Sequence, residues 1–255
     1  MVLVALYSSL LVLSPSSLYS WTTSHVWRLM HKGVTWPVFG KAGWVLALNA
    51  AAILSGVSMQ LSPIPTLMQV HASSSTGALD GLPFVMLALS SGLWFIYGHM
   101  SGDLALVWTN IVGVSLGFAY VALFHFYCHN SASLMRLKVY LQAIAVSLLA
   151  LFALTLACPR QRAVQVVGAV CSVLQSLTYA APLSTVWEVI ASRSTRALPA
   201  PLCCMGFASA SVWLIYGLAV SDEVLIVPNL LGVVCGAMQL CLLALYREEQ
   251  YYALK

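Results

Sequence analysis

Charged residues are scarce in this chain of 255 residues. Only 7% of them are Asp, Glu, Lys or Arg, whereas 61% are hydrophobic. Because a soluble domain has about 25% charged residues, this composition indicates a membrane protein. Clusters of Lys and Arg are also missing, which argues against a nucleic-acid partner. The 7 cysteines form no CxxC pair and lie mostly in apolar runs, so we expect no metal site and no cofactor.

The apolar segments lack internal charge. They lie at about 43–70, 81–98, 104–127, 137–157, 163–190, 199–219 and 223–246. All but the second approach or exceed about 20 residues, the length that crosses a bilayer, and the second can extend into its flanks. Their interiors hold no Asp, Glu, Lys or Arg. Ion-coupled carriers usually keep carboxylates or histidine chains at membrane depth, so this absence favours a passive carrier of an uncharged solute.

Catalytic groupings are missing as well. The sequence shows no nucleophile beside a base, no phosphate-binding loop and no paired carboxylates. These are the groupings from which an active site is ordinarily recognised. We therefore predict that the protein is not an enzyme.

One stretch of the chain occurs twice. Trp94-Phe-Ile-Tyr-Gly98 leads to Asn110, and the matching motif Trp213-Leu-Ile-Tyr-Gly217 leads to Asn229, each 119 positions later. The same offset relates Pro63 to Pro182, Asp103 to Asp222, Gly113 to Gly232, Gly117 to Gly236 and Tyr127 to Tyr246. A fixed period without a gap indicates two copies of one structural unit. Each copy holds three apolar segments, and the fourth segment joins the copies and restores a parallel orientation.

We therefore predict an all-α membrane protein with seven transmembrane helices in a 3-1-3 order. Two parallel three-helix bundles are then related by a pseudo-two-fold axis along the membrane normal. The predicted parts are an N-terminal arm (1–41), a first repeat (42–128), a linker helix (129–162), a second repeat (163–247) and a cytosolic tail (248–255). The apolar start of the arm predicts a signal peptide or anchor, and an arm that lies on the surface or is disordered remains the alternative.

Trp94 and Asn110 each lie eight residues from a turn near Gly102. At 1.5 Å per residue, this spacing places both about 12 Å below the turn, close to the midplane of a hydrocarbon core about 30 Å thick. Trp213 and Asn229 repeat the pattern around a turn near Ser221. Flat rings suit the C–H face of a sugar, and amides suit its hydroxyl groups. We predict a sugar site here, although a single Asn is more simply explained as a bond between helices.

Four prolines lie towards the face opposite these turns: Pro63, Pro83, Pro182 and Pro199. They are either hinges of a moving carrier or ordinary kinks and helix-start prolines, and spacing does not decide between these. Asp103 and Asp222 precede apolar segments and predict helix N-caps. Tyr97 and its repeat mate lie one helical turn outside the Trp level, where they either narrow the outer exit or belong to an aromatic belt.

Taken together, these motifs resemble the SWEET family of sugar transporters. Gly81-Leu-Pro-Phe84, Trp-x-x-Tyr-Gly and Asn-x-x-Gly resemble the first half of a member. Tyr179-Ala-Ala-Pro-Leu-Ser184, Ser194-Thr195, Leu198-Pro199 and Val227-Pro-Asn229 resemble the second half, and the similarity covers about residues 43–247. Members of this family are themselves a standard example of parallel repeats. The resemblance implies bidirectional facilitated diffusion (uniport) of mono- or disaccharides by alternating access, with the N-terminus outside and the C-terminus in the cytosol.

The resemblance also assigns roles to residues. It implies that Asn110 and Asn229 bind the sugar and that Trp94 and Trp213 close the pocket. The hinges are then Pro63, Pro83, Pro182 and Pro199, and the outer gate comprises Tyr97, Gly98, Gly217 and Pro228. Met59 falls where members tune pocket size, with Thr178 as its repeat mate, and a bulky Met59 favours a monosaccharide. The plasma membrane is the expected location. Thr109 stands before Asn110 where the second repeat has Pro228, so the two gates differ.

Two other functions stay open at this stage. One is a PQ-loop carrier of another small solute, although Pro63 precedes Ile64 and Pro182 precedes Leu183, so the Pro-Gln dipeptide is missing. The other is a receptor or sorting protein with seven spans that does not transport, although long cytosolic loops are missing. The glycine-rich faces can pack within the chain or between copies, so a homo-oligomer is also left open.

Overall fold

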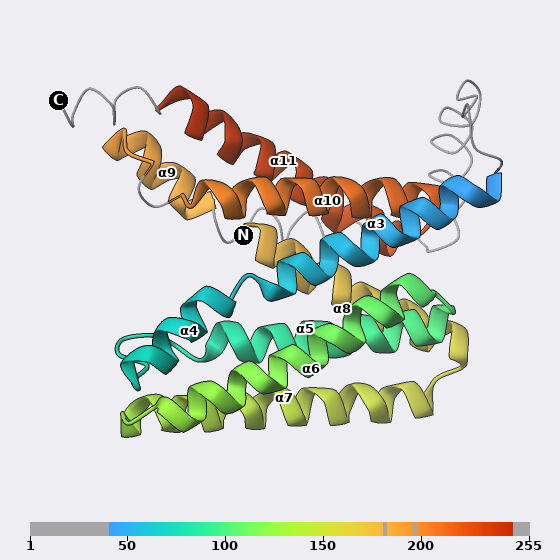
Figure 1. The fold of residues 1–255 in the computed structure, drawn as a ribbon. Coiled ribbons are helices and arrows are strands. Elements are labelled where there is room, and N and C mark those ends of the chain that lie inside the picture. The colour runs from blue at the N-terminus through green and yellow to red at the C-terminus, as the bar shows by residue number, and fades with distance from the viewer. Residues whose placement is uncertain (1–40, 181–182, 196–197, 247–255) are drawn as a thin grey trace. The chain divides into compact units, whose positions relative to one another are not determined.

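The computed structural model describes residues 41–180, 183–195 and 198–246, and these contain helices and no strand (Figure 1). The helices are α3 (Lys41–Leu61), α4 (Ile64–Ser73), α5 (Leu82–Ser101), α6 (Leu104–Tyr127), α7 (Ser131–Ala157), α8 (Arg160–Ala180), α9 (Leu183–Ser192), α10 (Ala200–Val220) and α11 (Glu223–Leu245). The chain divides into two units, residues 1–44 and 45–255. Apart from the first residues of α3, all of these helices belong to the second unit.

Six stretches of the described residues are long and apolar enough to cross a membrane: Gly43–Ser73, Leu82–Ser101, Leu104–Tyr127, Ser131–Ala157, Ala200–Val220 and Glu223–Leu245. They coincide with six of the predicted segments. The remaining segment, 163–190, falls on α8 and α9, between which residues 181–182 lie outside the described residues. Arg160 and Arg162, together with three glutamines, make α8 less apolar than the other helices. The linker helix α7 has none of its most apolar window buried in the protein, as a helix that faces lipid would.

The α5–α6 and α10–α11 hairpins are built alike. Gly102 ends α5 with φ +79°, a conformation that glycine adopts without steric cost. Ser221 ends α10 with φ +58°. The Asp103 side chain then accepts from Leu106 N, and the Asp222 side chain accepts from Val224 N, so the predicted N-caps are confirmed. We call the end of the bundle that holds Gly102 and Ser221 the turn end.

Glycines allow close packing inside each hairpin. A Cβ atom added at Gly117 would lie 2.7 Å from the Ala88 Cα of α5, and one added at Gly236 would lie 3.1 Å from the Phe207 Cα of α10. No side chain fits between the helices at these points. The small-xxx-small pattern therefore serves packing within the repeat, which is one of the two alternatives that the sequence left open.

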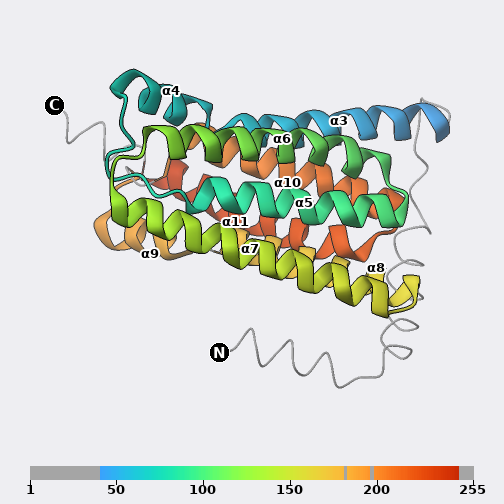
Figure 2. The same ribbon diagram turned by 90° about the horizontal axis from the view of Figure 1, so that it is seen from below.

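The buried apolar residues form three clusters. The first lies towards the turn end and takes residues from α3, α5, α6, α8, α10 and α11, including Trp94 and Trp213. The second belongs to the first repeat and α7, with Phe84 and Phe124. The third belongs to the second repeat, with Val189 and other residues of α9, α10 and α11. Figures 1 and 2 show α4 and α9 at the end opposite the turns. The repeats thus share a core near the turn end and keep separate cores at the other end.

Helix α8 links the repeats. It packs against α11 of its own repeat and α5 of the first repeat. At this junction, a Cβ atom at Gly168 would lie 2.8 Å from both Tyr97 Cε2 and Val224 Cγ2. The absence of a side chain at Gly168 therefore leaves room for the Tyr97 ring to reach the second repeat.

Candidate functional site

Two hydrogen-bonded pairs cross between the repeats at the turn end. The Tyr97 hydroxyl donates to both oxygens of Asp222, at 3.0 and 2.8 Å, and the Tyr216 hydroxyl donates to both oxygens of Asp103, at 2.9 Å. Each aspartate also caps a helix of its own repeat. Burial raises the pKa of the Asp222 carboxyl above its usual range, and the hydrogen bond from Tyr97 opposes this shift. The two hairpins are therefore fastened to each other by pseudo-symmetric contacts.

Each of these tyrosines packs edge-on against the tryptophan of its own motif. The ring centroids of Trp94 and Tyr97 are 5.9 Å apart at 84°, and those of Trp213 and Tyr216 are 5.6 Å apart at 85°. All four side chains are buried. The burial of Tyr97 and Tyr216 disagrees with an aromatic belt at the lipid interface, the alternative that the sequence left open. The tryptophans thus form the layer next to the crossed pairs.

Asn110 and Asn229 are buried and are held alike. Each side-chain Nδ2 donates to a carbonyl four residues earlier in its own helix, Leu106 O or Leu225 O, at 2.8 Å. Asn229 Oδ1 also accepts from the Tyr179 hydroxyl at 3.4 Å, which is long for an O–H···O bond. An amide has two N–H donors and a carbonyl acceptor with two lone pairs. The bonds within the helix therefore orient both side chains and leave hydrogen-bonding capacity for a ligand.

Trp213 of the second repeat reaches the level of Asn110 in the first. A Cβ atom at Gly56 of α3 would lie 2.6 Å from Thr109 Cγ2 and 3.4 Å from Trp213 Nε1. Thr109 directly precedes Asn110, so the Trp213 ring lies beside the part of α6 that holds Asn110. The Thr109 hydroxyl is buried without a partner among the described residues. Its repeat mate, Pro228, is buried inside α11.

Three of the four predicted hinge prolines are described. Pro63 precedes α4 at a break after α3, Pro83 lies in the first turn of α5, and Pro199 precedes α10. Pro182 lies outside the described residues. All three described prolines stand at helix starts, where Pro costs no hydrogen bond. Such positions are compatible both with hinges and with simple helix starts.

The other predicted gate residues lie where the helices approach closely. A Cβ atom at Gly98 would lie 2.7 Å from Leu106 Cβ, and one at Gly217 would lie 3.0 Å from Leu225 Cβ. The two residues predicted to set pocket size differ in their surroundings. Met59 is half-buried, whereas Thr178 is exposed and its hydroxyl donates to Leu174 O of its own helix at 2.9 Å.

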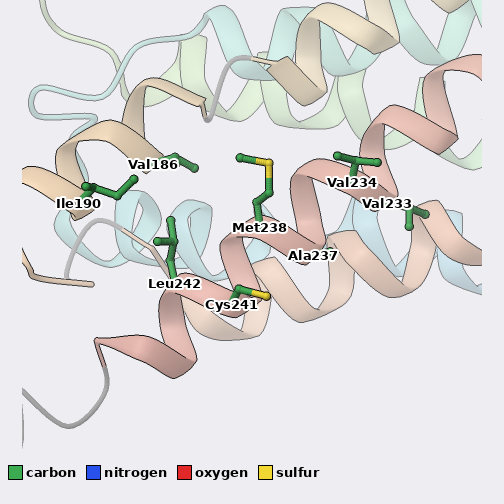
Figure 3. A pocket seen from close by; sticks show the side chains of 8 residues that line it. All are labelled: Val186, Ile190, Val233, Val234, Ala237, Met238, Cys241 and Leu242. Atoms are coloured by element: carbon green, nitrogen blue, oxygen red, sulfur yellow. The ribbon is translucent and has the colours of Figure 1, made fainter.

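A cavity of about 530 Å³ lies elsewhere, between α9 and α11 (Figure 3). Its lining comprises Val186, Ile190, Val233, Val234, Ala237, Met238, Cys241 and Leu242. None of these side chains has an oxygen or nitrogen that could bind a hydroxyl group, and none was predicted for the site. The candidate site is therefore the buried Trp and Asn level, and not this cavity.

Three features of the site were not predicted from the sequence. The pairing of Tyr97 with Asp222 was not predicted, because the cap role already explained each aspartate. Gln60 was not singled out either, and Tyr179 was named only as part of a family motif and was given no role. They are repeat mates of different type, and each lies beside the glycine that follows the repeated Asn by three residues, Gly113 or Gly232. One signal could have identified Gln60 from the sequence. It is a polar residue inside an apolar run, at a position where the two copies of the repeat differ.

Comparison with known proteins places the chain in a family. Residues 47–132 and 165–251 match the family model described as "Sugar efflux transporter for intercellular exchange". The chain is 29% identical over 204 residues to Sugar transporter SWEET1 of Drosophila pseudoobscura pseudoobscura, covering 80% of this chain and 90% of the relative. It is 32% identical over 213 residues to Bidirectional sugar transporter SWEET15 of Oryza sativa subsp. japonica, covering 82% of this chain and 66% of the relative.

A solved structure supports the same assignment. The structure of a eukaryotic SWEET transporter matches with a TM-score of 0.74 and 29% identity, over 80% of this chain and 97% of that chain. The predicted all-α fold of seven transmembrane helices in a 3-1-3 order is thereby confirmed, and so is the prediction that the protein is not an enzyme. The chain is a multi-pass integral membrane protein and belongs to the SWEET family of sugar efflux transporters.

Proposed function

We propose that this protein transports sugar by bidirectional facilitated diffusion and works by alternating access. The observation on which this rests is the difference between the two ends of the bundle. At the turn end, the crossed Tyr–Asp pairs and a shared core hold the repeats together. At the other end, each repeat has a core of its own. Such a pair of bundles can pivot about a central site and expose it to one side at a time.

The structure then represents a state that is closed at the turn end. We propose that the N-terminus faces the outside and the C-terminus the cytosol of a plasma-membrane protein, so that the closed end is the outer one. Opening it requires the hydroxyl groups of Tyr97 and Tyr216 to leave their carboxylate partners. Pro63, Pro83 and Pro199 are proposed hinges at the opposite end, and Pro182, which lies outside the described residues, is proposed as the fourth hinge. Gly98, Gly217 and Pro228 complete the proposed outer gate.

The proposed substrate is a monosaccharide bound between the repeats. The rings of Trp94 and Trp213 offer apolar faces to its C–H groups. Asn110 and Asn229 use the N–H and carbonyl positions that their own helices leave free. Met59, half-buried on α3, and Thr178 are proposed to limit the size of the site. The described spans offer no carboxylate at this level, so we propose that the sugar gradient alone drives transport.

Uptake of labelled glucose by cells that lack hexose transporters tests this proposal. We expect the parent to equilibrate glucose across the membrane, to show faster tracer exchange when unlabelled sugar is present on the other side, and to ignore collapse of the proton gradient. Asn110→Ala and Asn229→Ala should abolish uptake at unchanged surface expression, whereas Gln142→Ala, an exposed change on α7, should not. Accumulation against the sugar gradient, or normal uptake by both Asn variants, would contradict the proposal.

A further inference from the structure

A second polar group lies one helical turn from Asn110, on the side away from the turn end. Gln60 of α3 is only 7% exposed. A Cβ atom at Gly113 would lie 2.6 Å from Gln60 Nε2 and would also meet Ser91 Oγ. Gly113 follows Asn110 by three residues on α6, and Ser91 precedes Trp94 by three residues on α5. The Gln60 amide and the Ser91 hydroxyl therefore share the level next to the Trp and Asn residues.

The Gln60 side chain has an unused acceptor. Its Oε1 atom is buried and accepts no hydrogen bond from any described residue. Its backbone carbonyl is already bonded to the Tyr120 hydroxyl at 3.1 Å, so the side-chain carbonyl is the spare group. Buried polar atoms are nearly always paired, and an unpaired one is costly at membrane depth. This position therefore calls for a hydrogen-bond donor that the described protein does not supply.

The second repeat differs at the same level. The repeat mates of Gln60 and Ser91 are Tyr179 and Ala210. A Cβ atom at Gly232 would lie 2.7 Å from Tyr179 Cζ and 2.9 Å from Ala210 Cβ, so an aromatic ring and a methyl group fill this position. The Tyr179 hydroxyl is already bonded to Asn229. The spare acceptor is thus present on the first-repeat side, whereas on the other side a ring whose hydroxyl is already bonded and a methyl group take its place.

The other buried side-chain oxygens that lack a hydrogen-bond partner in the described part of the chain also lie in the first repeat. Among the described residues, Asn49 Oδ1 and Thr109 Oγ1 share the condition of Gln60 Oε1. Asn49 lies on α3 and Thr109 on α6, so all three belong to the first repeat. Their repeat mates are Gly168, Pro228 and Tyr179, of which only Tyr179 has a polar side-chain atom. Unsatisfied hydrogen-bonding capacity is therefore concentrated on one side of the site.

We propose that Gln60 determines sugar specificity through a hydroxyl-binding subsite that includes Ser91. In this subsite, Gln60 Oε1 accepts a hydrogen bond from one hydroxyl group of the sugar. The inference rests on the proposed transport function and adds an orientation to it: one hydroxyl faces the first repeat, and the opposite side of the sugar faces the second. Because the spare atom is a carbonyl oxygen, it selects a group that can donate. A fluorine or a methyl ether at that position cannot donate and is discriminated against.

Competition experiments with glucose analogues test the subsite. Each hydroxyl group of glucose is replaced in turn by fluorine, and each analogue competes with labelled glucose for uptake by the parent and by Gln60→Met. The parent should bind the analogue altered at the Gln60 position about 3- to 10-fold more weakly than glucose, the loss of one neutral hydrogen bond. Gln60→Met should bind glucose more weakly by a similar factor and lose discrimination at that one position. Gln142→Met, the same change at an exposed site on α7, should keep the parent pattern.

The outcomes separate this inference from the proposed function. Gln60→Met that transports glucose and still discriminates at every position overturns the subsite while leaving the transport function intact. If Gln60→Met does not reach the cell surface, Ser91→Ala is tested in its place. Ser91→Ala should weaken discrimination at a single hydroxyl position of glucose. Unchanged discrimination at every hydroxyl position would overturn the proposal. A correctly located parent that takes up none of glucose, fructose and sucrose contradicts the transport function, and the subsite falls with it.

Discussion

Removal of the two crossed hydrogen bonds should open the turn end. Tyr97→Phe deletes only the hydroxyl group that donates to Asp222 and leaves the edge-on contact with Trp94 in place. A hydrogen bond to a charged group contributes about 1.5–3 kcal/mol. Because both aspartates are only half-buried, solvent screening places the effect near the lower limit. Each Tyr→Phe change should therefore reduce the closed-to-open ratio about 10-fold, and the combination with Tyr216→Phe should reduce it up to about 100-fold.

Spin labels on the two hairpins measure this ratio. Leu104 and Glu223 begin α6 and α11, are exposed and are repeat mates. A label at each position, in a variant without the native cysteines, reports the distance across the turn end by pulsed electron resonance. The parent should show mainly the short distance of the closed state. The long distance should grow in Tyr97→Phe and grow further in the double variant.

A double-mutant cycle provides the control. Tyr97 bonds to Asp222 of the other repeat and not to Asp103, the cap that follows it in its own repeat. Tyr97→Phe and Asp222→Asn should therefore be coupled by about 1–1.5 kcal/mol, whereas Tyr97→Phe and Asp103→Asn should be additive within about 0.5 kcal/mol. Equal coupling in both cycles, or an unchanged distance distribution in the double tyrosine variant, would refute the reasoning.

Three further predictions rest on the same geometry. Gly117→Ala should lower the thermal midpoint in detergent, because its methyl group would overlap the Ala88 backbone at a cost of about 1–3 kcal/mol, whereas Gly92→Ala, with no atom within 4 Å, should not; equal midpoints would contradict the packing. Burial raises the pKa of Asp222 in the closed state, so this state binds a proton more tightly than an open state with a solvated carboxylate. Acidification into the titration range of Asp222, which lies above that of an exposed carboxyl group, should therefore raise the fraction of closed protein, and Asp222→Asn should abolish this response. A decrease in the closed fraction on acidification would contradict the prediction. If Pro63 is a hinge, Pro63→Ala should slow glucose exchange more than it weakens glucose binding, and an equal loss of both would favour a folding role.

Local signals in the sequence predicted most of the helices and turns. The αL residue Gly102 and the cap Asp103 act within a few positions of themselves, so one copy of the motif suffices to place them. The first apolar segment, 43–70, was predicted as one span with a hinge or a kink at Pro63, and the helix is broken there, between Leu61 and Ile64. Pro63 explains the break, because it lacks the N–H group that would continue the ladder of hydrogen bonds. Length and hydropathy cannot detect such an interruption.

Contacts between the repeats were not predictable in the same way. The period shows that Tyr97 and Asp103 recur as Tyr216 and Asp222, but it does not show that each tyrosine bonds to the aspartate of the other copy. That pairing depends on how the two copies pack around their common axis. Gln60 escaped notice for a related reason, since a search for matching residues passes over the positions at which the copies differ.

Positions that match between the repeats and positions that differ between them have different physical roles. A gate closed by two bundles about a pseudo-two-fold axis needs the same donor and acceptor in each copy, because Tyr97 meets Asp222 as Tyr216 meets Asp103. A sugar has no two-fold axis, so a site that is symmetric throughout cannot complement both of its sides. Divergence between the repeats is therefore expected where they touch the substrate. The replacement of a spare carbonyl at Gln60 by the bonded hydroxyl of Tyr179 occurs next to the symmetric Trp and Asn residues, the level at which we propose that such divergence distinguishes one hydroxyl group of the substrate from another.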